Sequence, residues 1–255
     1  MQHHASENDI VVTSLTTETI DARIEARFAA MLDPFERAQM EKFKFDQDRC
    51  AYVAAHGLLR HSLSARTGYN SGSWRFALSP GGKPFVEEPA AASAIRFSLS
   101  HTRTMVAVAI ADGYDIGVDV EACGCSNTID LNIAERYFTA SEITLLRELS
   151  ELESKNQIFL ELWTLKEAVV KATGLGLSQS LDSFSIAFDP LRVIKQDNAH
   201  ETLQWFGRES WSLRHWLHRD HHISVAAHGQ RVKPRFHLQE ADIELIQLNS
   251  LLSGN

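Results

Sequence analysis

The stretch IRFSLSHTRTMVAVAIADGYDIGVDVE, residues 95–121, decides the fold. Apolar and polar side chains alternate over 95–100, which predicts a half-buried strand. A turn at 101–104 leads to an apolar strand at 105–111, and a third strand follows at 116–121. Three successive strands joined by short connections predict an antiparallel meander.

Helices are predicted on both sides of this stretch, because apolar residues recur there at helical spacing. The expected helices cover 18–32, 33–45, 48–65, 127–150 and 155–173. Further strands are expected at 10–16, 74–78, 184–188, 211–217 and 223–227, with a short helix or irregular tail at 239–252. Helices, strands, helices and strands in this order favour an α+β fold with two similar lobes over a regular βαβ array.

The composition excludes several classes of protein. The 255 residues carry 25 Lys and Arg against 33 Asp and Glu, a net charge of −8, so the basic surplus of a nucleic-acid-binding protein is missing. No apolar run approaches the roughly 20 residues that span a bilayer. Three cysteines suit a reducing compartment, and the N-terminus lacks the pattern of a signal peptide. We therefore expect a cytoplasmic protein that binds neither nucleic acid nor membrane.

Two carboxylates lie on one face of the last strand. Alternation directs Val118 and Val120 to the core and places Asp119 and Glu121 together on the opposite face. Neighbouring carboxylates repel each other unless water or a cation separates them, and Mg²⁺ prefers such oxygen ligands. The alternative is an ordinary solvent-exposed strand face.

A second cluster lies on the strongest predicted helix, 155–173. Trp163, Glu167 and Lys171 are four residues apart and therefore share one side of the helix. Spacing alone is equally satisfied by a surface Glu–Lys pair worth a few tenths of a kcal/mol. The large tryptophan beside the pair and the glycines at 174 and 176 favour a functional role.

A third cluster combines a fixed loop with a strand end. Lys83 stands between Gly82 and Pro84, and a lysine binds phosphate as a point charge. Ser100 and His101 lie where a strand enters a turn, a common position for ligand-binding residues, although a histidine there is often structural. The common nucleotide-binding motifs GxGxxG and GxxxxGK[ST] are missing from the sequence.

Taken together, these clusters resemble the Sfp-type 4′-phosphopantetheinyl transferases. The family order is G-K-P, F-x-[IL]-S-H, G-[IV]-D-[IV]-E, W-[ST]-x-K-E-[AS]-x-x-K and G-x-G-L-S. In this chain the five motifs begin at Gly82, Phe97, Gly117, Trp163 and Gly174. The resemblance covers roughly residues 33–228, and its strength lies in the order and spacing of the motifs.

The resemblance implies two pseudo-symmetric lobes, each a small antiparallel sheet with packed helices. Residues 1–112 would form the N-terminal lobe on the coenzyme A side, and 113–255 the C-terminal lobe with the metal and catalytic residues. Coenzyme A would bind in the cleft between them, and the chain would act as a monomer. The implied reaction transfers the 4′-phosphopantetheine group from coenzyme A to a serine of a carrier protein and releases 3′,5′-ADP.

The resemblance also implies roles for individual residues. The ligands of Mg²⁺ would be Asp119, Glu121 and Glu167. The phosphates would be contacted by Lys83, Ser100 and His101. Glu167 would also be the base, and Lys171 would stabilise the leaving group. Family members place basic residues on the helix near 36–47 to bind the 3′-phosphate, whereas this chain has Glu36, Gln39 and Gln47. Arg49, Arg37 and Lys44 lie close by and are the candidates to replace them.

Partners and alternatives follow from the same resemblance. The carrier would be an acyl or peptidyl carrier domain of a fatty acid, polyketide or nonribosomal peptide synthase, with secondary metabolism the usual setting. It would dock near 123–150, where Leu131, Ile133, Phe138 and Leu145 are apolar. Two other readings use the same residues: a metal-dependent hydrolase of the coenzyme A pyrophosphate, and a non-catalytic module that binds coenzyme A or the carrier.

Overall fold

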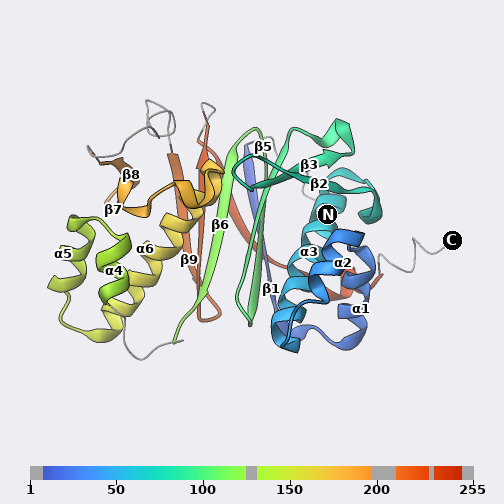
Figure 1. Cartoon of the computed structure of the whole chain (residues 1–255), viewed down its shortest axis with the longest axis horizontal. Coiled ribbons are helices and arrows are strands. Elements are labelled where there is room, and N and C mark those ends of the chain that lie inside the picture. Colours follow the sequence, from blue (N-terminus) through green and yellow to red (C-terminus); the bar gives the residue numbers. More distant parts are fainter. Residues whose placement is uncertain (1–7, 125–130, 197–210, 230–232, 249–255) are drawn as a thin grey trace. The chain divides into compact units, whose positions relative to one another are not determined.

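The computed structural model combines helices with small sheets (Figure 1). It describes residues 8–124, 131–196, 211–229 and 233–248. Contacts divide the chain into two compact units. The first contains the described parts of 1–77, 85–112 and 235–255, and the second contains those of 78–84 and 113–234.

The first unit is built on a four-stranded sheet with the strand order β11-β1-β5-β4. Its strands are β1 (Asp9–Thr16), β4 (Ile95–His101), β5 (Met105–Asp112) and β11 (Arg235–Glu240). β4 and β5 form an antiparallel hairpin, β1 runs antiparallel to β5, and β11 runs parallel to β1. β5 is buried from Met105 to Ala111, which explains its continuous apolar sequence.

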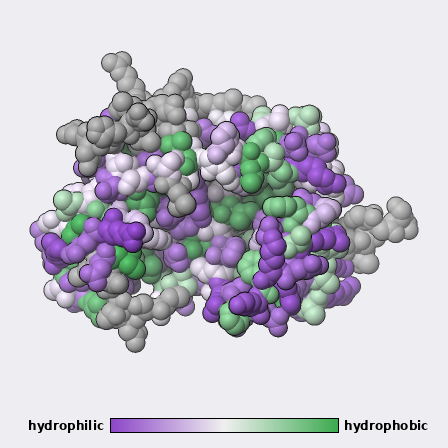
Figure 2. Space-filling model, in the orientation of Figure 1, coloured by the Kyte–Doolittle hydropathy of each residue, from purple (hydrophilic) through white to green (hydrophobic). Residues whose placement is uncertain are grey.

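Three helices gather on one side of this sheet (Figure 1). They are α1 (Ala22–Met31), α2 (Pro34–Met40) and α3 (Asp46–Thr67). Asp21 caps α1, and Asp33 with Glu36 forms a capping box at the start of α2. α3 packs against α1 and β5, and a Cβ at Gly57 would lie 2.3 Å from the ring of Phe28, so the two helices meet closely. Figure 2 shows mostly hydrophilic residues over the region of α1 and α2, with apolar residues among them, and Phe35 of α2 is exposed.

Short elements complete the first unit. A two-stranded hairpin of β2 and β3 follows α3 in the chain, and α7 lies near the end of the described residues. Their bounds are β2 (Arg75–Leu78), β3 (Pro84–Glu88) and α7 (Ile243–Leu248). The core beneath these elements includes the fully buried side chains of Phe28, Leu58, Leu63 and Trp74.

The second unit is built on a three-stranded antiparallel sheet with the order β6-β10-β9. Its strands are β6 (Asp115–Ala122), β9 (Trp211–His218) and β10 (His221–His228). Arg219 and Asp220 join β9 to β10 with φ values of 45° and 55°, the left-handed conformation of a two-residue hairpin turn. The register places Asp119 opposite Ser224 and Glu121 opposite His222.

One long helix covers this sheet. α6 packs against β6 and β10, with α5 and the β7–β8 hairpin on its other side. The remaining bounds are α4 (Leu131–Tyr137), α5 (Ala140–Glu148), α6 (Leu152–Thr173), β7 (Phe184–Phe188) and β8 (Leu191–Lys195). Lys166 of α6 is fully buried, and its ammonium is 2.9 Å from the Glu142 carboxylate and donates to two main-chain carbonyls near β7. This buried pair fixes α5 and β7 against α6.

The predicted α+β class is confirmed; β1 and β11 are parallel, and β5 with β1 and β4, β10 with β6 and β9, and β7 with β8 are antiparallel. One prediction was wrong: among the described strands, β6, which was expected to complete a meander, pairs with β10 in a separate sheet from β4 and β5. The hydrophobic pattern predicts a strand but not its partner, which here lies about 100 residues later in the chain. β3, β8 and β11 were not predicted, since each is short and carries charged residues.

Helix boundaries also shifted. The stretch 127–150, expected to be mostly helical, contains two helices, α4 and α5, and its first residues lie outside the described part of the chain. A capping box formed by Thr139 and Glu142 starts α5. Among the described helices, none combines the length and apolar composition of a membrane span.

Candidate active site

The strand β6 presents two carboxylates to α6. Val118 and Val120 are buried on one face, and Asp119 and Glu121 share the other face with Gly117, as the alternation predicted. Asp119 is 5% exposed and Glu121 is half-buried. The exposed acidic strand face that sequence alone left open is therefore excluded for Asp119.

Gly117 allows β6 to lie directly on α6. A Cβ at this position would be 2.0 Å from the carbonyl oxygen of Ala168 and 2.5 Å from the amide nitrogen of Ala172. Both are main-chain atoms of the helix, so they cannot rotate away. This close approach explains why a glycine precedes the two carboxylates by two and four residues, and it sets the separation between strand and helix.

Strand and helix meet through direct polar contacts. The Lys171 ammonium donates to Asp119 Oδ1 at 2.7 Å. The indole of Trp163, two turns earlier on the same side of α6, donates to the Glu121 carboxylate. Glu167 lies between these two helix residues, and the predicted line of Trp163, Glu167 and Lys171 therefore faces the strand carboxylates.

The carboxylates repel one another. Burial raises the pKa of Glu121, the charges of Asp119 and Glu167 raise it further, and Lys171 and the indole of Trp163 oppose the shift. Burial also raises the pKa of Glu167, with Asp119 adding to it and Lys171 opposing it. Three carboxylates thus share a small volume with one ammonium, an arrangement that stabilises an added positive charge.

The donor chemistry of this cluster fits Mg²⁺, since the three side chains offer hard oxygen ligands. The side chains do not form a finished metal site: in the described part of the chain, no group of three or more His, Cys, Asp or Glu side chains is arranged to hold a metal ion. Lys171 donates to Asp119 Oδ1, so one oxygen of this carboxylate already has a cationic partner. The predicted ligand set of Asp119, Glu121 and Glu167 therefore stays a prediction.

Behind the carboxylates lies a pair of histidines that the sequence reasoning missed. His222 is opposite Glu121 in the register, and His215 on β9 lies 3.0 Å from His222 between ring nitrogens and 3.3 Å from Glu161. Burial lowers the pKa of each histidine to about 4. Both rings are therefore neutral near pH 7. The alternation along β9 and β10 was the signal that places them on the α6 side.

Lys83 belongs to the second unit, which also contains Asp119, Glu121, Glu167 and Lys171. Its ammonium donates to the carbonyl oxygens of Ile116 at 3.0 Å and Ala172 at 2.8 Å. The sequence predicted an aimed ammonium at this loop but not these main-chain partners. Its predicted phosphate contact stays a prediction.

Ser100, His101 and Arg49 belong to the first unit. Ser100 is buried and His101 is exposed at the end of β4, beside the turn to β5. The structure brings Asp119, Glu121, Glu167, Lys171 and Lys83 together in the second unit and leaves these three in the first.

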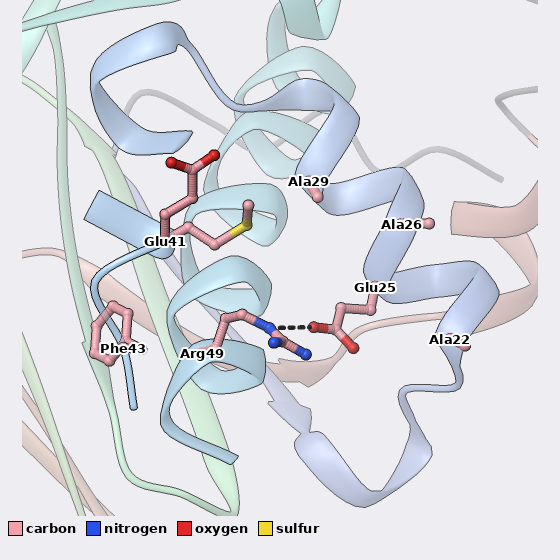
Figure 3. A pocket seen from close by; sticks show the side chains of 8 residues that line it. Ala22, Glu25, Ala26, Ala29, Glu41, Phe43 and Arg49 are labelled. Atoms are coloured by element: carbon pink, nitrogen blue, oxygen red, sulfur yellow. Dashed lines mark hydrogen bonds and ion pairs between the residues drawn. The ribbon is translucent and has the colours of Figure 1, made fainter. Parts of the chain in front are cut away.

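A pocket of about 450 Å³ in the first unit contains Arg49. Figure 3 shows Arg49 of α3 and Glu25 of α1 pointing toward each other, and the ring of Phe43 lies beside them. Arg49 Nε is 3.3 Å from Glu25, and Nη1 is 3.0 Å from Asp46. Two of the three guanidinium nitrogens of Arg49 therefore already have carboxylate partners.

The other candidates for the 3′-phosphate differ in their partners. Glu36 is buried, and its carboxylate is 2.7 Å from the guanidinium of Arg60. Arg37 donates to the last carbonyls of α1. Lys44 is exposed. The buried ion pair gives Glu36 a structural role in holding Arg60.

The predicted carrier-docking residues are only partly exposed. Ile133 is 39% exposed, Leu145 is half-buried, and Phe138 is in the core of the second unit. The side chain of Leu131 lies outside the described part of the structure.

Known proteins match the chain over most of its length. The family model described as the 4′-phosphopantetheinyl transferase superfamily matches residues 115–226, and the model described as 4′-phosphopantetheinyl transferase, N-terminal, matches 23–112. The 4′-phosphopantetheinyl transferase HetI of Nostoc sp. is 32% identical over 209 residues, 82% of this chain and 83% of its own. A 4′-phosphopantetheinyl transferase of Bacillus pumilus is 31% identical, covering 68% and 73%, and Sfp of Bacillus subtilis is 30% identical, covering 63% and 68%.

Proposed function

Because the chain belongs to the 4′-phosphopantetheinyl transferase superfamily, we propose that the polar cluster between β6 and α6 is its catalytic centre. The chain is an enzyme that transfers phosphopantetheine from coenzyme A to carrier proteins. The observation that carries the proposal is the 2.7 Å contact between Lys171 and Asp119. Burial and the charge of Asp119 raise the pKa of both Glu121 and Glu167, and the charge of Glu167 also raises the pKa of Glu121. Buried carboxylates with raised pKa values are typical of catalytic sites.

The reaction is a phosphoryl transfer to a hydroxyl. The serine oxygen of the carrier bonds to the phosphorus that bears the pantetheine arm, and the bond from that phosphorus to the bridging oxygen breaks. The electron pair of the broken bond leaves with 3′,5′-ADP, and Glu167 accepts the serine proton, directly or through water. The raised pKa of Glu167 supports this role, because a stronger base accepts a proton more readily near neutral pH.

Lys171 supplies positive charge at the same place. Its ammonium already compensates Asp119, and in the reaction it would stabilise the negative charge that develops on the leaving 3′,5′-ADP. Loss of one such stabilising group typically lowers the rate on the order of 10²-fold or more.

Magnesium is part of the proposal. Asp119, Glu121 and Glu167 would hold the ion once Lys171 turns from Asp119 toward the nucleotide. When bound, Mg²⁺ neutralises the charge of the coenzyme A pyrophosphate. The mutual repulsion of the three carboxylates supports this assignment, since a divalent cation relieves it.

The coenzyme A contacts are proposed for both units. Ser100, His101 and Arg49 would bind nucleotide phosphates from the N-terminal lobe, 1–112, and Lys83 would do so as a point charge. The C-terminal lobe, 113–255, would supply the metal and catalytic residues. The position of Arg49 at a pocket of about 450 Å³ supports its assignment, with its contacts to Glu25 and Asp46 as the groups that a phosphate would compete with.

The partners are proposed from the family. We expect acyl or peptidyl carrier domains of fatty acid, polyketide or nonribosomal peptide synthases as acceptors, in secondary metabolism, and a cytoplasmic monomer as the working form. Ile133, exposed on α4, supports carrier docking on the second unit.

Intact-mass spectrometry of a carrier domain tests the function. With coenzyme A and Mg²⁺, the carrier should gain the mass of one phosphopantetheine arm at its serine. Glu167→Gln should abolish the gain, and Glu153→Gln, an exposed carboxylate near the start of the same helix, should not. No gain across a panel of carriers contradicts the proposal. Equal release of 3′,5′-ADP without a carrier indicates a pyrophosphate hydrolase, and binding without turnover indicates a binding module.

A further inference from the structure

The loop that carries Lys83 is seated on the end of α6. A Cβ at Gly81 would lie 1.8 Å from the carbonyl oxygen of Gly174, the C-cap of α6, whose φ is +69°. A Cβ at Gly174 would in turn lie 3.2 Å from Cδ of Lys83, so the lysine stem crosses the helix end. Glycines on both sides therefore allow the loop backbone and the helix end to touch.

The Lys83 ammonium donates to one carbonyl at the end of α6 and to one carbonyl of β6. Ala172 is in the last turn of α6, where carbonyls have no partner within the helix and carry partial negative charge. Ile116 is in β6, which pairs only with β10 among the described strands and so has one edge without a neighbouring strand. A cation between these two oxygens ties helix to strand.

We propose that Lys83 is a positioning residue, which clamps the end of α6 to the start of β6 and thereby holds Lys171 and Asp119 in register. The two clamped carbonyls flank the catalytic contact in sequence: Ile116 precedes Asp119 by three residues, and Ala172 follows Lys171 directly. Movement of strand against helix at the clamp is thus transmitted to the 2.7 Å contact. This inference rests on the proposed function for its kinetic consequence, but the clamp itself is a property of the protein without substrate.

Lys83→Met tests the clamp, because methionine keeps the stem and removes the ammonium. Hydrogen exchange in the protein without coenzyme A should quicken about tenfold or more at the end of α6, since hydrogen bonds from a charged donor are lost. With coenzyme A and a carrier, kcat should fall about ten- to a hundredfold, in addition to any rise in the KM for coenzyme A that follows from loss of the proposed phosphate contact. Lys83→Arg, which keeps a charged donor, should restore most of kcat. Lys155→Met, near the other end of α6, should match the wild type.

A second variant disturbs the clamp and keeps the Lys83 ammonium. Gly81→Ala places a methyl group against the Gly174 carbonyl and should push the loop off the helix, with the same fast exchange and the same fall in kcat. It decides the question if Lys83→Met fails to fold. Unchanged exchange in both variants, or a loss confined to KM, overturns the clamp and leaves Lys83 as a substrate contact only. If the wild-type protein modifies no carrier, the proposed function is refuted. If the two variants nevertheless show faster hydrogen exchange than the wild type, the clamp is still supported.

Discussion

Replacing Gly117 by alanine is expected to disable the enzyme through geometry alone. The new Cβ would lie 2.0 Å from the Ala168 oxygen and 2.5 Å from the Ala172 nitrogen, whereas real Cβ contacts are essentially never under 3.0 Å. Strand and helix must therefore separate by roughly 1 Å, and the 2.7 Å contact between Lys171 and Asp119 then exceeds hydrogen-bond length. A displacement of about 1 Å at a catalytic site can cost on the order of 10² in rate.

The same substitution should also destabilise the second unit, because overpacking typically costs about 1–3 kcal/mol. The assay is kcat/KM for carrier modification together with thermal unfolding, and Gly72→Ala is the control, since its Cβ would meet a single atom at 3.7 Å. Gly117→Ala should lose about a hundredfold or more in kcat/KM while remaining folded at assay temperature. A variant that is folded and fully active would refute the claim that this close approach positions the site.

Three more predictions follow from the same contacts. The rate should fall at low pH, because Glu167 then takes up a proton and no longer acts as a base. Lys171→Met removes the charge that lowers the pKa of Glu167, so the acid limb of the pH–rate profile should move to higher pH. The same variant should lower kcat on the order of 10²-fold. Trp163→Phe removes the hydrogen bond that lowers the pKa of Glu121, so the Mg²⁺ concentration needed for half-maximal activity should rise, and rise more at lower pH. Lys166→Met leaves a buried carboxylate without its cation and should lower the free energy of unfolding by about 3–5 kcal/mol in urea titrations; a loss below about 1 kcal/mol would contradict the buried-pair account.

The sequence predicted elements well where their periodicity is local. The helix ending at Gly174 and the strand at 116–121 both form, and the side chains of Asp119 and Glu121 share a face as alternation requires. Spacing of four likewise placed Glu167 and Lys171 on one side of α6. Those relations depend only on the 3.6-residue and two-residue periods of helices and strands.

The partners of these elements were not predictable in the same way. Pairing of β6 with β10 depends on a strand far along the chain, and the short charged strands β3 and β8 give weak hydrophobic patterns. Main-chain acceptors carry no sequence signal, so the carbonyl partners of Lys83 could not be foreseen. The contacts that Gly117 makes with α6 were likewise hidden, since a glycine in a strand is compatible with several structures.

The central claim is that Asp119 and Glu121 of β6 and Glu167 of α6 together bind one divalent cation when coenzyme A is bound. A crystal structure with coenzyme A and Mg²⁺ tests it most directly. We expect one ion bound by oxygens of Asp119, Glu121 and Glu167 at about 2.1 Å, with Lys171 turned from Asp119 to the nucleotide. An ion bound elsewhere, or a Lys171–Asp119 contact that persists with coenzyme A in place, would contradict the account.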